Sequence, residues 1–373
     1  MKIIYCPEKK LIGVKRQLEG QEKYEFDFML RAVRIINTLN DPVQLIKYVF
    51  ELKTKGETIK KIVYSKDVIK AKSEELQGVV ERLAVKQEDE VREEARKHNI
   101  LLFLGVKNFW KKENYALDSL EPGKETGFRL EHFRTLVEKP IDELIFTVVY
   151  KQADETKKTS IQIPIIEYKN KKEYIFPLKG TWLVFGNWDD AYNHRTMHSQ
   201  EFGFDLVQLN DNLQFEQTFE KPNEEFKCYN EDLLAVADGE VVDCFDGMPE
   251  NPSAIKMISN EEKREIIEKS GFVPLISGNY AIIKHATNEY SFYAHIKNGS
   301  LKIKKGENVT QGQVIGSLGN SGNSTGPHLH FHLMDKPSIL TGRGLPIHFT
   351  NLKSFIGEKI TFIENSFLLV NTE

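Results

Sequence analysis

Three histidines alternate with apolar residues within the last third of the chain. They occupy every second position of the segment Gly326-Pro327-His328-Leu329-His330-Phe331-His332-Leu333. Residues two positions apart in a β-strand project from the same face, so this pattern predicts a strand with three imidazoles on one side and apolar side chains on the other. Neutral imidazoles on one face are good ligands for a borderline metal such as zinc. The sequence therefore predicts a metal site if further ligands are brought to this face.

A catalytic zinc site normally has three protein ligands and one open position for water or substrate. Outside the histidine segment, the candidate ligands are His194, His198 and Asp205, and His295 is a further isolated histidine. The chain has only three cysteines, and none stands in CxxC spacing, so a thiolate zinc cluster is not predicted. Taken alone, Asp205 fits a strand edge and the histidines fit a protein surface. Their combination with the histidine segment favours a metal site.

Several motifs follow one another in the C-terminal half of the chain. They are Tyr293-Ala294-His295, Gly312-Gln313-Val314-Ile315-Gly316 and the run Gly319-Asn320-Ser321-Gly322-Asn323-Ser324-Thr325-Gly326-Pro327-His328-Leu329-His330. Together with Asp205 after a histidine, this series resembles the lysostaphin or LytM type of zinc metallopeptidase, in its long-loop branch. The resemblance covers about residues 180 to 340, and its last run is highly specific. No family is assigned to residues 1 to 125.

The resemblance implies a role for five residues. His194, Asp205 and His330 would bind one zinc ion, while His295 and His328 would be two unligated catalytic histidines acting on a metal-activated water. We expect His328 to help deprotonate the water and His295 to stabilise the developing oxyanion, although these two roles are exchangeable. No HExxH motif occurs in the chain, so a glutamate general base on a zinc-binding helix is not expected.

Two positions leave alternatives open. His194 and His198 precede Asp205 by eleven and seven positions, whereas compact members of the family leave only three residues between these ligands. We prefer His194, because Asn193-His194 followed by a loop resembles the longer-loop branch, and His198 remains the alternative. His332 stands where many members have glutamate, and it is expected either to support a ligand or to face solvent rather than to bind zinc.

The resemblance also implies a substrate class. Proteins of this type usually cleave short cross-links of bacterial peptidoglycan, so the expected function is a zinc-dependent metalloendopeptidase with a peptide substrate of this kind. The alternative is a catalytically weak binding or regulatory module of cell-wall hydrolysis, which usually lacks some of the ligands. A phosphotransfer carrier with two facing histidines is a third possibility, but it would not need His194 and Asp205 as metal ligands.

Composition and the first residues bear on partners and location. The 51 basic and 55 acidic residues nearly balance, which gives no electrostatic reason to expect a nucleic-acid partner. Residues 1–10 become charged almost at once, and the longest early apolar run, 100–104, is far shorter than the roughly 20 residues that cross a bilayer. Membrane insertion is therefore not expected. The expected location is cytoplasmic, or the cell wall if peptidoglycan is the substrate.

The predicted fold class is a multidomain α+β protein whose first part, residues 1–125, is mainly helical. Apolar residues at helical spacing predict one helix at 27–39. Asp41-Pro42 looks like an N-cap followed by proline, which predicts a second helix that ends near residue 56. A third helix is predicted over about 66–98.

The remaining chain is predicted to be rich in strands. Residues 126–180 contain short apolar runs separated by polar turns, which predicts a β-rich module. Residues 181–345 are expected to form the peptidase domain, an antiparallel β-sheet resembling the duplicated hybrid motif fold. Within it, Ser259 and Glu262 stand at capping-box spacing before a short helix that ends near residue 269. Residues 346–373 are predicted as a strand-like extension.

Overall fold

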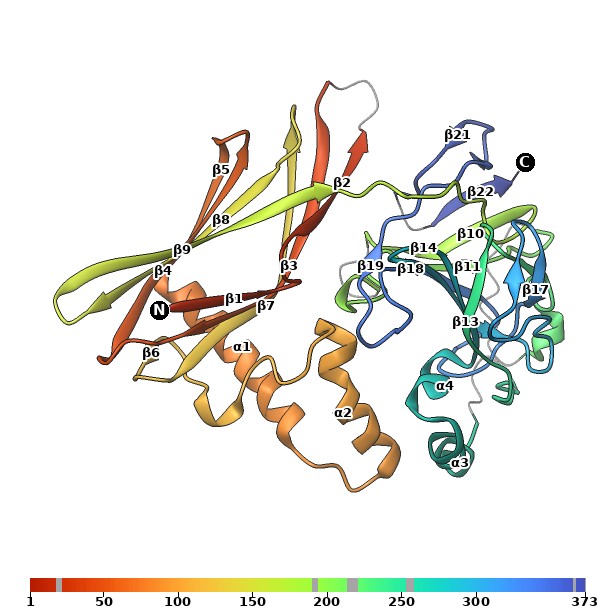
Figure 1. The fold of residues 1–373 in the computed structure, drawn as a ribbon, viewed down its shortest axis with the longest axis horizontal. Coiled ribbons are helices and arrows are strands. Elements are labelled where there is room, and N and C mark those ends of the chain that lie inside the picture. The colour runs from red at the N-terminus through yellow and green to blue at the C-terminus, as the bar shows by residue number, and fades with distance from the viewer. Residues whose placement is uncertain (18–21, 190–193, 213–220, 253–257, 365–366, 373) are drawn as a thin grey trace. The chain divides into compact units, whose positions relative to one another are not determined.

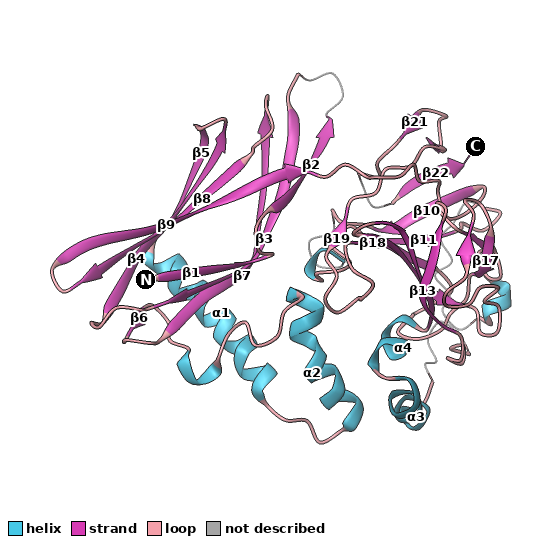
Figure 2. Ribbon diagram, in the orientation of Figure 1, coloured by secondary structure: helices cyan, strands magenta, loops and turns pink. Residues whose placement is uncertain are grey.

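The computed structural model describes residues 1–17, 22–189, 194–212, 221–252, 258–364 and 367–372 (Figure 1). Asn193, which favoured His194 over His198, lies outside these ranges. The chain divides into two compact units, one made of Met1–Lys86 and Val106–Tyr168, the other of Gln87–Gly105 and Lys169–Glu373. Strands dominate both units (Figure 2). The expected boundary between residues 125 and 126 is not found, because both sides of it lie in the first unit.

The first unit contains a sheet in the order β1-β3-β2-β9-β8-β4-β5, to which β6 is added beside β4 and β7 beside β3. Strands β2 and β9 pair in parallel, and the other described pairs are antiparallel. The strands are β1 (Lys2–Cys6), β2 (Leu11–Gln17), β3 (Tyr24–Ile36), β4 (Val43–Thr54), β5 (Glu57–Tyr64), β6 (Ser119–Leu120), β7 (Glu125–Val137), β8 (Glu143–Gln152) and β9 (Glu155–Glu167).

The predictions of helices at 27–39 and from Asp41-Pro42 to 56 are wrong, because these segments form β3 and β4. Residues 26–33 of β3 are all buried, so both faces of the strand are covered. A strand buried on both faces lacks the alternation of apolar and polar residues that distinguishes a strand from a helix. Strand β4 lies between β5 and β8, and its pairing on both sides overrides the local helical pattern.

The helix predicted at 66–98 is confirmed in part, because it forms two helices in different units. Helix α1 (Lys66–Ala84) lies against β4 and β7 of the first unit. Helix α2 (Glu90–Leu104) belongs to the second unit. The side chain of Asp89 caps its N-terminus by accepting a hydrogen bond from the Arg92 N–H, and Gly105 ends it in a left-handed conformation. A short 3-10 helix, η1 (Lys112–Asn114), follows in the first unit.

The second unit contains an antiparallel sheet in the order β16-β13-β14-β15-β18-β11-β10-β22-β20-β21, with β19 beside β18. Strands β12 and β17 form a separate pair. The prediction of an antiparallel sheet in this part of the chain is confirmed. The strands are β10 (Thr181–Gly186), β11 (Phe204–Val207), β12 (Asp232–Leu234), β13 (Gly239–Phe245), β14 (Asn279–Ala286), β15 (Glu289–Ile296), β16 (Asn308–Val309), β17 (Val314–Ser317), β18 (Leu329–Met334), β19 (Gly344–Leu345), β20 (Leu352–Ser354), β21 (Lys359–Ile360) and β22 (Leu368–Thr372).

Residues 329–334 form the central strand β18, so the predicted strand is confirmed for His330 and His332, while His328 immediately precedes it. Every residue of this strand is buried, and it pairs with β15 on one side and β11 on the other. On the apolar face, the ring of Phe331 packs against Tyr293 and Phe349. The opposite face carries His330 and His332. A fully paired and covered strand therefore holds these two imidazoles on a rigid support.

Helices and the C-terminal strands complete the second unit. The capping box predicted at Ser259 and Glu262 is confirmed at the start of α3 (Asn260–Ser270). Helix α4 (Phe272–Ser277) follows, and η2 (His194–Thr196) and η3 (Asn223–Glu225) are short 3-10 helices. The predicted strand-like extension supplies β20, β21 and β22, which join the sheet through β10. None of the helices in the described ranges is long and apolar enough to cross a membrane.

Candidate active site

The register of three strands brings the candidate residues together. Strand β11 pairs with β18 so that Asp205 lies directly opposite His330, and β15 pairs on the other side so that Ala294 lies opposite His330. Side chains directly opposite in an antiparallel pair lie about 5 Å apart at their Cβ atoms. His295 follows Ala294 at the end of β15, and His194 enters from η2.

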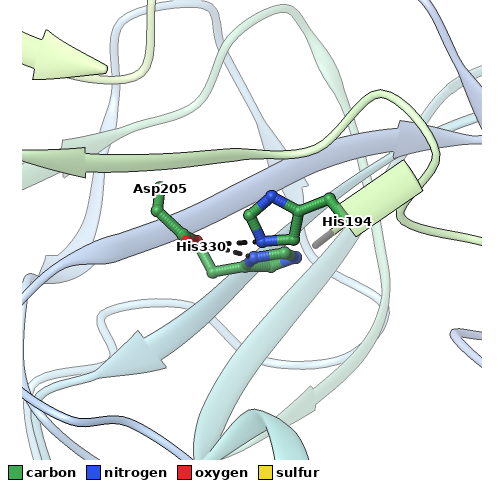
Figure 3. A group of neighbouring side chains, drawn as sticks. All are labelled: His194, Asp205 and His330. Carbon is green, nitrogen blue, oxygen red and sulfur yellow. Dashed lines mark hydrogen bonds and ion pairs between the residues drawn. The ribbon is translucent and has the colours of Figure 1, made fainter. Parts of the chain in front are cut away.

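Ligand atoms of His194, Asp205 and His330 all lie within 4.8 Å of one another. Figure 3 shows the two imidazoles and the carboxylate converging. Nε2 of His194 is 3.2 Å from Oδ2 of Asp205, and Nδ1 of His330 is 3.0 Å from Oδ1. Two nitrogen donors and one oxygen donor are a ligand set that zinc accepts, and three protein ligands leave a position open. The residues present therefore fit a zinc ion.

The charges around Asp205 also suit a metal. Burial alone would raise the pKa of Asp205, but the neighbouring His194, His328 and His330 outweigh this effect and hold the pKa well below its usual range. Burial lowers the pKa of His330, although the hydrogen bond to Asp205 opposes this shift. An ionised carboxylate and a neutral imidazole are the protonation states that metal ligation requires.

His295 and His328 stand beside this group, and both are held in the same way. Nδ1–H of His295 donates to the Ser321 carbonyl at 2.7 Å, and Nδ1–H of His328 donates to the Gly326 carbonyl at 2.8 Å. In a neutral imidazole with the proton on Nδ1, Nε2 carries a lone pair. The two ring centroids are 4.6 Å apart, so two proton acceptors lie together.

The backbone of His295 adopts a strained conformation at this position. Its φ is +60°, a left-handed conformation that a residue with a side chain rarely adopts. Strain of this kind persists only where the surrounding structure imposes it, and it is common at functional sites. Burial, together with His328 and His330, lowers the pKa of His295 well below its usual value, which keeps the ring neutral.

The glycine-rich run that precedes β18 supports the two histidines through its serines. The hydroxyl of Ser321 accepts from the Asn279 N–H and donates to the Ile296 carbonyl, and the hydroxyl of Ser324 donates to the Gly326 carbonyl. Gly322 has a φ of +76°, and a Cβ there would lie 2.2 Å from the Gly278 nitrogen. The run thus positions carbonyl groups that orient His295 and His328.

Two cavities meet at Asp205, Thr325 and His328, which line both of them. One cavity also exposes the metal-ligand candidates His194 and His330. The other has apolar walls from Phe185, Phe226 and Pro327 among others. The polar group therefore lies where two hollows join, an arrangement that can receive an extended substrate on both sides of the reacting bond.

The structure distinguishes His194 from the alternative His198 by position. The ring of His198 lies against Gly105 at the end of α2, and its backbone N–H donates to the Leu102 carbonyl at 2.7 Å. His194, rather than His198, approaches Asp205 among the described residues.

Three other side chains near this group are His332, whose role was left open, and Tyr293 and Leu102, for which no role was predicted. His332 does not face solvent, because it is fully buried and bonds to His330. Tyr293 is also buried, and its hydroxyl bonds to the backbone of Leu234 and Val236, which is a packing role. Leu102 of α2 lines the cavity beside the metal-ligand candidates, although no motif around it predicted this position.

Comparison with known proteins identifies part of this unit. Residues 263–340 match the model of Peptidase family M23. The chain is 41% identical over 69 residues to the peptidoglycan DD-endopeptidase ShyC of Vibrio cholerae, which covers 18% of this chain and 15% of that protein. It is 43% identical over 58 residues to the peptidoglycan DD-endopeptidase ShyA of the same organism, with 16% and 13% covered. The matches thus span a small part of the length of these relatives.

Among solved structures, the catalytic domain of lysostaphin from Staphylococcus simulans is 19% identical, with 45% of this chain and 85% of that chain covered. Its TM-score of 0.24 is too low to indicate a shared fold by itself. The matched family segment contains His295, His328 and His330, while His194 and Asp205 precede it. The resemblance to a LytM-type peptidase is confirmed, since residues 263–340 match the Peptidase family M23 model and similar proteins include peptidoglycan DD-endopeptidases.

Proposed function

We propose that the second unit is a zinc metalloendopeptidase that hydrolyses peptide bonds in bacterial peptidoglycan cross-links. The observation that carries the proposal is the grouping of a carboxylate and two imidazoles in mutual contact beside two further imidazoles with Nε2 lone pairs. The substrate class is supported by the names of relatives such as ShyC and ShyA, which are peptidoglycan DD-endopeptidases.

His194, Asp205 and His330 are the proposed zinc ligands. Their donor atoms already lie within 4.8 Å of one another, and the two imidazoles are buried. A zinc ion bound there would polarise a peptide carbonyl and lower the pKa of a bound water to about 7.

His328 is the proposed general base. Its Nδ1–H is used by the Gly326 carbonyl, so Nε2 is free to accept a proton from the attacking water. Nε2 lies 3.6 Å from Oδ1 of Asp205, and this carboxylate stabilises the imidazolium that forms. The same ring can then return the proton to the leaving amine.

His295 is proposed to orient the reactants rather than to stabilise an oxyanion. A neutral His295 with its proton on Nδ1 has no second N–H to donate, and burial disfavours the imidazolium that would have one. Its Nε2 would instead accept a hydrogen bond from the attacking water or from a substrate N–H. The hydrogen bond to Ser321 thus favours a different role from the one expected by resemblance.

The experiment that tests the function combines zinc quantification with mass spectrometry of peptidoglycan digests. We expect one zinc per chain and cleaved cross-links for the wild-type protein and for His348→Ala, an exposed histidine outside the site. His330→Ala should lose both zinc and cleavage. A zinc-loaded protein that cuts other peptides but never peptidoglycan would overturn the substrate class. A metal-free protein that binds peptidoglycan without cutting it would support a regulatory module instead.

A further inference from the structure

His332 is a fully buried histidine on the same face of β18 as His330. Its ring packs against Phe292 of β15, with 4.9 Å between ring centroids. Its Nδ1 lies 3.0 Å from Nε2 of His330. Among the described residues, no hydrogen-bond partner meets its own Nε2. Among the described residues, His330 is therefore the polar partner of the His332 side chain.

Packing does not explain a histidine at this position. A buried nitrogen without a partner costs stability. A leucine or phenylalanine would cover Phe292 without this cost. The bond to His330 is therefore the feature that sets His332 apart from an apolar residue.

We propose that His332 is a positioning residue that holds His330 in the orientation and tautomer needed to bind zinc. The inference rests on the proposed function, because it takes His330 as a ligand. Nδ1 of His330 faces Asp205, so this nitrogen is the one directed at the metal position. The ring proton must then sit on Nε2, where His332 Nδ1 is placed to accept it. Metal-binding histidines commonly donate their other N–H to such a partner, and its loss typically weakens metal binding 10- to 100-fold.

The same geometry implies that the hydrogen bond between the two rings reverses when metal binds. Without metal, the carboxylate of Asp205 accepts from Nδ1–H of His330, whose Nε2 then accepts from Nδ1–H of His332. With metal, His330 carries its proton on Nε2 and donates, so His332 carries its own proton on Nε2. Each ring has one proton before and after. The signature is a change of tautomer at both rings without a change of charge.

Nitrogen NMR of the full chain labelled at histidine tests this directly. We expect His332 to carry its proton on Nδ1 in the metal-free protein and on Nε2 after zinc is added. A buried residue with only a packing role would keep one tautomer in both states. Finding the proton of His332 on Nδ1 in the zinc-bound protein would overturn the proposal, because this ring could then not accept a hydrogen bond from His330.

Substitutions give an independent measure through zinc affinity, determined by competition with a chelator. His332→Gln keeps an oxygen that can accept from His330, and we expect its affinity to stay within about threefold of wild type. His332→Leu should bind zinc about 10- to 100-fold more weakly. The matched control is His285→Leu on β14, a buried histidine bonded to the Asp238 carbonyl and the Ser291 hydroxyl. It should lose stability but not zinc affinity.

The outcomes separate this proposal from the function on which it rests. If His330→Ala retains zinc, the proposed metal site itself is wrong. If His330→Ala loses zinc while His332→Leu binds it as tightly as wild type, only the positioning role fails. Should His332→Leu not fold, the tautomer measurement on the wild-type protein still decides.

Discussion

Asp27 in the first unit and Asp205 in the second unit each contact a histidine, but they differ in their other partners. In the first unit, Oδ2 of the buried Asp27 lies 2.7 Å from Nε2 of His132 and accepts from Nε of Arg134 at 2.8 Å. A guanidinium is always charged, so this carboxylate has a permanent counter-charge. The pair in the first unit is therefore complete without any added ion, whereas no arginine or lysine among the described residues pairs with Asp205 in the second unit.

The side chains that contact Asp205 in the described structure are the imidazoles of His194, His328 and His330. Each of these rings can be neutral, and an ionised carboxylate away from water is costly without a cation. A metal ion bound at the proposed site would supply a permanent positive charge beside this carboxylate. Among the described contacts, the arginine that neutralises Asp27 and is not found beside Asp205 is the difference that favours a metal site at Asp205.

The largest expected effect comes from removing the charge of each aspartate in turn. Asp205→Asn should abolish zinc retention and lower peptidoglycan hydrolysis by about 1000-fold or more, because the site loses its anionic ligand. Asp27→Asn should keep zinc and activity but lower the free energy of unfolding by about 1–3 kcal/mol, since it weakens charge-assisted hydrogen bonds. Zinc analysis and denaturant unfolding check both variants, and zinc loss in Asp27→Asn would break the comparison.

The next largest effect, that of His328→Ala, distinguishes the proposed general base from the proposed zinc ligands around Asp205. His328→Ala should retain one zinc per chain while hydrolysis falls about 10²- to 10⁴-fold, the range expected for a lost general base. Stopped digests with zinc measured on the same samples separate chemistry from metal binding. Full turnover in this variant would exclude His328 as the base.

A smaller effect is expected from pH on the metal-free protein. Burial lowers the pKa of His295, His330 and His332, so these rings are neutral in the folded chain. Below the ordinary value near 6.5, the unfolded chain binds more protons than the folded chain, and stability falls as the pH falls. Each ring contributes up to about 1.4 kcal/mol per pH unit. Calorimetry should give a lower melting temperature at pH 5.5 than at pH 7.5, and the opposite order would contradict neutral buried rings.

The smallest effect is expected at the alternative ligand. His198→Ala should leave the zinc content unchanged, because its ring lies against Gly105 rather than Asp205. His194→Ala should lose zinc under the same dialysis conditions. If the two variants behave in the reverse way, the first ligand is His198 and the site must rearrange when metal binds.

The histidine strand could be predicted, because residues two positions apart lie on the same face of a strand, and the two imidazoles of β18 are spaced in this way. The capping box of α3 was equally local, since Ser259 and Glu262 contact each other directly. The prediction that His194 approaches Asp205 relied on the family resemblance, because the ten intervening residues show no regular pattern that would predict their structure. Features set by neighbouring residues could be predicted from the sequence, whereas contacts between residues far apart in the sequence could not.

The first unit was mispredicted for a related reason. Strand β3 is covered on both faces, so its buried residues run consecutively and do not alternate. The pairing of β3 with β7 joins residues about 100 positions apart, and no local signal records it. The burial of His332 could not be predicted from the sequence either, because it depends on packing against Phe292 of a neighbouring strand.

The placement of α2 has a consequence for how the second unit can be separated from the rest of the chain. The sequence leaves the first unit for residues 87–105, returns to it, and leaves again after residue 168. Leu102, within residues 87–105, packs with Phe272 and Leu275 and lines the cavity of the site. A fragment that starts at residue 169 would lack this wall and expose the apolar side chains beneath it. The second unit is thus discontinuous in sequence and cannot be excised intact by a single cut.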